Sequence, residues 1–103
     1  MCEAFMVRHV MMWKVRSGAE DSEAILRIVK KELESLRGMV EGLESVRVSI
    51  FPYPSSSADA MVECVFDSPE ALAAYKAHPA HLAVANKYIR PYMESRLSFD
   101  SEI

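Results

Sequence analysis

The sequence predicts an α+β domain whose strands and helices follow in the order β-α-β-β-α-β. Two kinds of apolar spacing indicate this order: alternation with a period of two along four short segments, and recurrence every three to four residues along longer ones. The same order of elements is found in the ferredoxin-like fold. At 103 residues the chain has the length of a single domain, which we expect to cover residues 5–101.

The first expected strand covers residues 5–15, FMVRHVMMWKV, and carries apolar residues on both faces. Because side chains alternate along a strand, one face holds Phe5, Val7, His9, Met11, Trp13 and Val15. The second face holds Met6, Arg8, Val10, Met12 and Lys14. One layer of helices covers only one face of a sheet, so we expect a second copy of the chain to cover the other.

The first expected helix lies within residues 20–38 and has one apolar stripe, formed by Ile25, Ile28, Val29, Leu33 and Leu36. Ser17 and Asp21 are alternative N-caps, and Gly38 is the expected stop. Alternating β-branched residues then predict strands at 44–51 and 60–66. Two prolines and three serines predict a loop at 52–59, between these strands.

Ser68 and Pro69 are expected to cap and begin the second helical segment, whose inward face carries Leu72 and Tyr75. Pro79 would break that helix, so we expect a new helix to start there and to end near Pro91. Its inward stripe comprises His81, Ala85, Tyr88, Ile89 and Tyr92. A short last strand is expected at 96–100, with a surface ion pair between Arg96 and Asp100.

Composition excludes several classes of function. The net charge is −3 and no basic run exceeds two residues, which argues against a nucleic-acid partner. No stretch approaches the roughly 20 apolar residues of a membrane span, and the first residues do not form a secretory signal. Three isolated glycines exclude the phosphate-binding loops of nucleotide cofactors, so we expect no cofactor. Two cysteines without metal or disulfide spacing, Cys2 and Cys64, predict free thiols and a cytoplasmic location.

Three side chains are the candidate functional residues: His9, Tyr75 and His81. Each lies on the inward side of its own element, which predicts a polar pocket within an apolar shell. Met11, Trp13 and Tyr88 are expected to line that shell. Such a pocket suits a small apolar or aromatic ligand with one polar group. A buried hydrogen-bond network that only fixes packing is the structural alternative.

The two histidines near Pro79 have different expected roles. His81 lies in the first helical turn, where the helix dipole favours an uncharged imidazole that can take or give a proton near pH 7. His78 directly precedes the proline and is expected to face solvent or to cap the preceding helix. No neighbouring acid or cysteine completes a ligand set with them, so no metal site is expected.

Three segments of the chain resemble the stress-responsive dimeric α/β-barrel (Dabb) domain family, and the resemblance covers residues 7–100. The segments are RHVMMWKV, FDSPEALAAYKAHPAHLAVANKYIRP and RLSFD. The resemblance implies a homodimer in which two sheets pack together and close a barrel. It also implies a relation to plant polyketide cyclases, in which a pocket histidine and tyrosine act as acid and base. His81 and Tyr75 match those two residues and His9 matches a strand-one histidine, but Ala60 stands where the cyclases have another histidine.

Three functions are compatible with these expectations. The first is a Dabb-type barrel whose pocket binds a small molecule, or catalyses weakly in the manner of a polyketide cyclase, through His81 and Tyr75. The second is a stress protein without enzymatic activity, whose histidines are structural. The third, by fold analogy, is a cofactor-independent monooxygenase that uses His81 and Tyr75.

Overall fold

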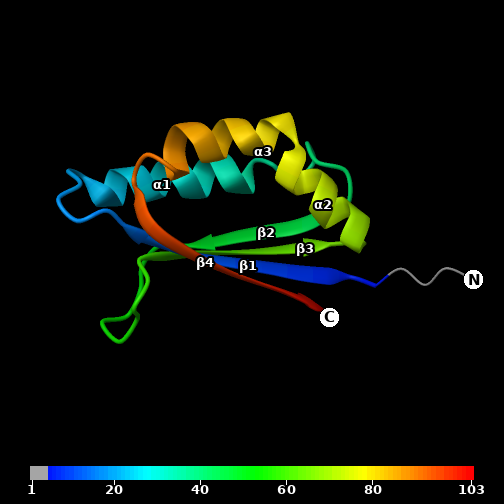
Figure 1. Ribbon diagram of the computed structural model, residues 1–103, viewed down its shortest axis with the longest axis horizontal. Helices are drawn as coiled ribbons and strands as arrows, with labels where there is room; N and C mark the ends of the chain where they lie inside the picture. The colour runs from blue at the N-terminus through cyan, green and yellow to red at the C-terminus, as the bar shows by residue number, and fades with distance from the viewer. Residues whose placement is uncertain (1–4) are drawn as a thin grey trace, which may run out of the picture.

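The computed structural model describes residues 5–103 as a layer of helices on one antiparallel sheet (Figure 1). The strand order is β2-β3-β1-β4, and each neighbouring pair is antiparallel. This is the ferredoxin-like arrangement that the sequence predicts. The elements are β1 (Val7–Val15), α1 (Ser22–Glu34), β2 (Leu43–Ser49), β3 (Ala60–Phe66), α2 (Pro69–Ala77), α3 (Pro79–Val84), the π-helix η1 (Ala85–Ile89) and β4 (Met93–Glu102).

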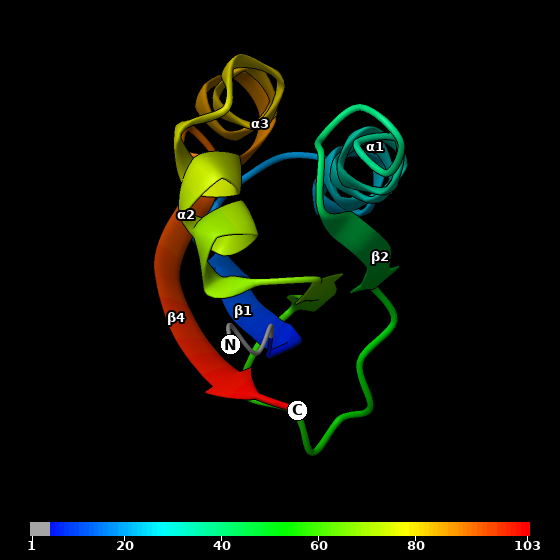
Figure 2. The same ribbon diagram turned by 90° about the vertical axis from the view of Figure 1, so that its right-hand side faces the viewer.

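The helices cover only one face of the sheet, as Figures 1 and 2 show. α1 lies beside the continuous run of α3 and η1, and α2 lies at one end of this layer. The hydrophobic core lies between the helices and the sheet and includes Leu33, Val48 and Phe66, which are all buried. Among residues 5–103, no helix combines the length and hydropathy needed to cross a membrane.

The buried stripe of α1 differs from the expected one at two positions. Leu26, Val29 and Leu33 face the core, whereas Ile28 is 42% exposed. The apolar stripe therefore includes Leu26, and Ile28 faces away from the core. Asp21 is the N-cap, with a φ of 57° and no side-chain hydrogen bond to the helix.

α2 and α3 each begin with a capping side chain followed by a proline. The Ser68 hydroxyl accepts a hydrogen bond from the Ala71 amide (3.1 Å), and Pro69 occupies the first turn of α2, as expected. Pro79 likewise begins α3. His78 caps both helices: as the expected C-cap of α2 its amide donates a hydrogen bond to the Tyr75 carbonyl (3.1 Å). As the N-cap of α3 its Nδ1 accepts a hydrogen bond from the Ala80 amide (3.0 Å).

The last helix changes from α to π geometry at Ala85. The Arg90 amide donates to the Ala85 carbonyl, five residues back, which is the π-helical pattern. Each π-helical residue turns through a smaller angle than an α-helical one, so the expected stripe does not continue to its end. Val84, Ala85 and Ile89 are buried, whereas Tyr92 is 38% exposed.

The sheet face opposite the helices carries an apolar cluster. Pairing between β1 and β4 places Val10 beside Phe99, and Met12 beside Leu97. Leu97 and Phe99 are each 68% exposed, although both are large and apolar. We call these four residues the outer apolar patch. β4 is also longer than the expected 96–100 and pairs with β1 over almost its whole length.

Candidate functional site

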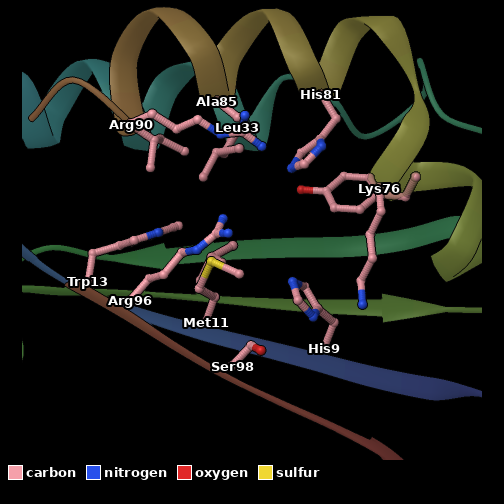
Figure 3. A pocket seen from close by; sticks show the side chains of 13 residues that line it. His9, Met11, Trp13, Leu33, Lys76, His81, Ala85, Arg90, Arg96 and Ser98 are labelled. Atoms are coloured by element: carbon pink, nitrogen blue, oxygen red, sulfur yellow. The ribbon is translucent and has the colours of Figure 1, made fainter. Parts of the chain in front are cut away.

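A cavity of about 370 Å³ lies between the helix layer and the sheet. Its volume is within the range of small-molecule sites in proteins. His9, Met11, Trp13, Tyr75 and His81 all line it. Figure 3 shows His9 extending from the sheet and His81 from the helix layer toward the same space.

Tyr88, which we also expected in the pocket, is not among the residues that line this cavity. Tyr88 lies within η1, where each residue rotates less about the helix axis than in an α-helix. Its side chain is therefore displaced from the helix face that carries His81 and Ala85. The Lys87 ammonium lies 5.2 Å from the centroid of the Tyr88 ring.

His9 is held in place by a carboxylate from the far end of the chain. Its Nδ1 is hydrogen-bonded to Asp100 Oδ1, and the second Asp100 oxygen lies 3.3 Å from Lys76 Nζ. Burial alone would raise the pKa of Asp100, but the hydrogen bonds and charges of His9 and Lys76 lower it below its ordinary value. The expected ion pair between Arg96 and Asp100 is therefore wrong, because Asp100 is hydrogen-bonded to His9 and paired with Lys76.

Tyr75 and His81 form a close pair in the cavity. Their ring centroids are 4.2 Å apart, and the Tyr75 and His9 centroids are 6.3 Å apart. Burial lowers the pKa of His81; the Lys76 backbone opposes this shift, and nearby positive charges, including Arg90, add to it. The imidazole of His81 is therefore uncharged at neutral pH and can accept a proton.

Tyr75 remains a neutral phenol at any physiological pH. Its side chain is 2% exposed, and burial raises the pKa of Tyr75 far above its ordinary value. Burial likewise raises the pKa of the neighbouring Cys64 thiol to about 12, and this cysteine is free. Cys2 lies outside the described residues. The Tyr75 hydroxyl can thus donate a hydrogen bond but cannot act as a phenolate base.

Two buried nitrogens at the cavity have no hydrogen-bond partner within residues 5–103: Trp13 Nε1 and His81 Nδ1. A buried polar atom without a partner costs about 1–3 kcal/mol. Both residues line the cavity, so an oxygen-bearing molecule bound there could relieve this cost.

Three charged residues that line the cavity were not anticipated: Lys76, Arg90 and Arg96. The sequence signal for Arg96 was its alternation with Ser98 and Asp100 along the last strand. The β1–β4 register places these three residues beside Trp13, Met11 and His9, respectively. No such periodicity marks Arg90, which follows the π-helix.

Residues 5–103 contain no group of three His, Cys, Asp or Glu side chains arranged to hold a metal ion. His9 and His81 are instead both neighbours of the Tyr75 ring, and His9 is hydrogen-bonded to Asp100. The arrangement offers an uncharged imidazole, a phenol donor and a carboxylate-oriented histidine.

Comparisons with known proteins agree with this fold. A family model described as the stress responsive A/B barrel domain (Dabb) matches residues 7–103. A dimeric protein of unknown function with a ferredoxin-like fold from Bacteroides fragilis has a TM-score of 0.86 and 24% identity, over 95% of this chain and 96% of that chain. A comparison with curated proteins found no match.

Two further solved structures are similar. A Dabb family protein from Mesorhizobium loti, with a ferredoxin-like fold, has a TM-score of 0.72 and 21% identity, over 94% of this chain and 95% of that chain. The hydroxynitrile lyase from Passiflora edulis has a TM-score of 0.79 and 14% identity, over 98% of this chain and 95% of that chain. At these identities the likeness is one of fold.

Proposed function

Because this chain belongs to the stress responsive A/B barrel domain (Dabb) family, we propose that it is a homodimeric barrel that binds a small, mainly apolar molecule. The binding site is the cavity bordered by His9, Tyr75 and His81. One observation supports this proposal above all: these three side chains come from three different elements and line one cavity whose walls are largely apolar. We further propose that residues 5–101 act as one domain in the cytoplasm, where Cys64 stays reduced.

The outer apolar patch supports the homodimer. Val10, Met12, Leu97 and Phe99 would be buried if the sheets of two copies packed face to face. Burial of such side chains is the main favourable term in protein association. The structural neighbour from Bacteroides fragilis is described as dimeric, which agrees with this assembly.

A second proposal is that the same site performs acid–base catalysis. It is supported by the 4.2 Å separation of the Tyr75 and His81 rings and by the uncharged state of His81. His81 would remove a proton from the substrate, and the Tyr75 hydroxyl would stabilise the negative charge that develops on a substrate oxygen. His9, oriented by Asp100, would position the substrate.

We propose one of two reactions for a site with these acid–base groups. The first is an aldol-type cyclisation, as in polyketide cyclases, and the second is oxygenation of an electron-rich aromatic compound. The hydroxynitrile lyase from Passiflora edulis is an enzyme with the same fold, so the fold can carry an active site. Ala60 occupies a buried position on β3 opposite Trp13, where it provides no third imidazole. Oxygen consumption would distinguish the two reactions.

A thermal-shift screen of the full chain with uncharged aromatic ketones and phenols tests the binding proposal. A ligand at 100 times its Kd is expected to add about 2.7 kcal/mol to the free energy of unfolding. His81→Ala and Tyr75→Phe should each weaken the stabilisation by that ligand. His78→Asn, which retains a helix-capping acceptor outside the cavity, should leave it unchanged.

Two results would contradict the proposal: no compound in the panel stabilises the protein, or His81→Ala and Tyr75→Phe bind as the wild type does. Catalysis needs a separate measurement, which is loss of a measured turnover in folded His81→Ala.

A further inference from the structure

The cavity has a charge opposite to that of the chain as a whole. Three of its lining residues are basic, Lys76, Arg90 and Arg96, and none is an aspartate or glutamate. The whole chain, by contrast, has a net charge of −3. A concentration of positive charge at one cavity of an acidic protein indicates a negatively charged ligand.

The three basic residues differ in how their charges are balanced. Lys76 is paired with Asp100, at 3.3 Å. Arg90 and Arg96 form no ion pair and donate no side-chain hydrogen bond to any residue in the range 5–103. The nearest acid in the sequence, Glu94, lines a neighbouring hollow with both arginines but lies beyond ion-pair distance.

The two arginines reach the cavity from opposite sides. Arg90 follows η1 in the helix layer, and Arg96 lies on β4 in the sheet. Figure 3 shows both side chains extending into the space between the two layers. Both arginines line the same cavity, so an anion bound there would have two unpaired guanidinium groups to attract it.

We propose that the ligand of this cavity is a small carboxylic acid whose carboxylate binds between Arg90 and Arg96. The inference rests on the proposed function and specifies the class of molecule that the site takes. An arginine guanidinium binds a carboxylate through two parallel hydrogen bonds, which gives orientation as well as affinity. Trp13 Nε1, buried and without a partner in the described chain, provides a further donor on the same side of the sheet as Arg96.

The remaining walls define the rest of the ligand. Met11, Trp13, Val62 and Ile89 supply apolar surface for a ring or short chain. Tyr75 and His81 can hydrogen-bond a second oxygen, such as a carbonyl or hydroxyl group. A phosphate is less well matched, because no glycine lines the cavity and a glycine-rich loop is what presents backbone amides to phosphates. The ligand class is therefore an aryl or alkyl carboxylic acid with one further oxygen function.

The single tryptophan of the chain, Trp13, provides a direct probe because it lines the cavity. Its fluorescence is titrated with benzoate, phenylacetate and 3-phenylpropanoate, and with the three corresponding neutral amides, at constant ionic strength. The best acid is expected to bind at least tenfold more tightly than its amide. Arg90→Gln and Arg96→Gln should each reduce acid affinity at least tenfold and leave amide affinity within about twofold.

Arg27→Gln is the matched control, because it removes the same charge from an exposed arginine on α1, outside the cavity. It should bind the acids as the wild type does. Arg96→Lys keeps the charge without the guanidinium and should give an intermediate affinity. Retained amide binding in the glutamine variants shows that they are folded.

Each contrary outcome has a distinct meaning. If acids and amides bind equally and both lose affinity in His81→Ala, the carboxylate inference is overturned and the proposed pocket stands. Acid binding that is unchanged in the Arg90→Gln/Arg96→Gln double variant also overturns the inference. If neither the acids nor the amides bind at about 10 mM, both the proposed small-molecule site and the carboxylate inference are overturned.

Discussion

At the scale of single residues, the buried His81 imidazole couples the stability of the protein to pH. Its pKa is below the ordinary value of about 6.5, so between the two values the unfolded chain binds a proton that the folded chain does not. The free energy of unfolding should therefore fall as pH decreases from about 7 toward 5. Urea unfolding at several pH values measures this slope.

His81→Gln is the control for that prediction, because glutamine cannot titrate. Over the same pH range its free energy of unfolding should depend on pH less steeply than that of the wild type. His9, Tyr75, Lys76 and Arg90 surround His81 and are unchanged in the variant. Equal slopes for the two proteins would show that His81 is not the titrating group.

Asp100 is the residue whose removal should reveal how His9 is held. Asp100→Ala leaves the buried Nδ1 of His9 without its partner, and the expected loss of stability is about 1–3 kcal/mol. Asp100→Asn keeps an acceptor oxygen and should lose less. Urea unfolding at pH 7 measures both. A neutral effect of Asp100→Ala would mean that this pair does not contribute to the folded state.

At the scale of elements, α3 depends on a histidine cap. His78 accepts a hydrogen bond from the Ala80 amide, and Pro79 leaves no amide of its own to satisfy. His78→Ala should cost about 1 kcal/mol of stability, whereas His78→Asn should cost only a few tenths, because asparagine is a good N-cap. Thermal unfolding of the two variants compares them. Equal losses would exclude the cap as the source.

The π-helix η1 sets which side chains of the last helix reach the cavity. Its wider turn brings Ala85 and Ile89 to the cavity wall and leaves Arg90 directed toward it from the helix end. A continuous α-helix would have brought Tyr88 toward the line of His81 instead. The π turn therefore replaces an aromatic side chain at the site with a cation.

At the scale of the whole molecule, the outer apolar patch should hold two copies together. Val10→Asp places a charge within the outer apolar patch, where burial against a second copy would remove its water without providing a partner. The variant should be monomeric at micromolar concentration, and sedimentation equilibrium measures this.

Ile28→Asp is the control for the dimer prediction. Ile28 is also apolar and 42% exposed, but it lies on α1, in the layer away from the outer apolar patch. This variant should remain dimeric. A monomeric wild type, or a dimeric Val10→Asp, would refute face-to-face packing of the sheets.

The sequence by itself determined the order of the elements, most of their boundaries and the family. These properties are local: alternation along β1 and β3, the caps at Ser68 and Pro69, and the break at Pro79 all act within a few residues. Local periodicity was also enough to direct His9, Tyr75 and His81 to the inner side of the fold, where the structure has them.

Only the tertiary structure decided which of these side chains meet and what surrounds them. Asp100 lies 91 positions from His9, and only the pairing of the first strand with the last brings them together. The same register sets Arg96 beside Trp13, and a π-helical turn without a clear sequence signal brings Arg90 into the cavity. The physical reason is that periodicity specifies the face on which a side chain lies, whereas the registers between distant strands and helices specify its neighbours.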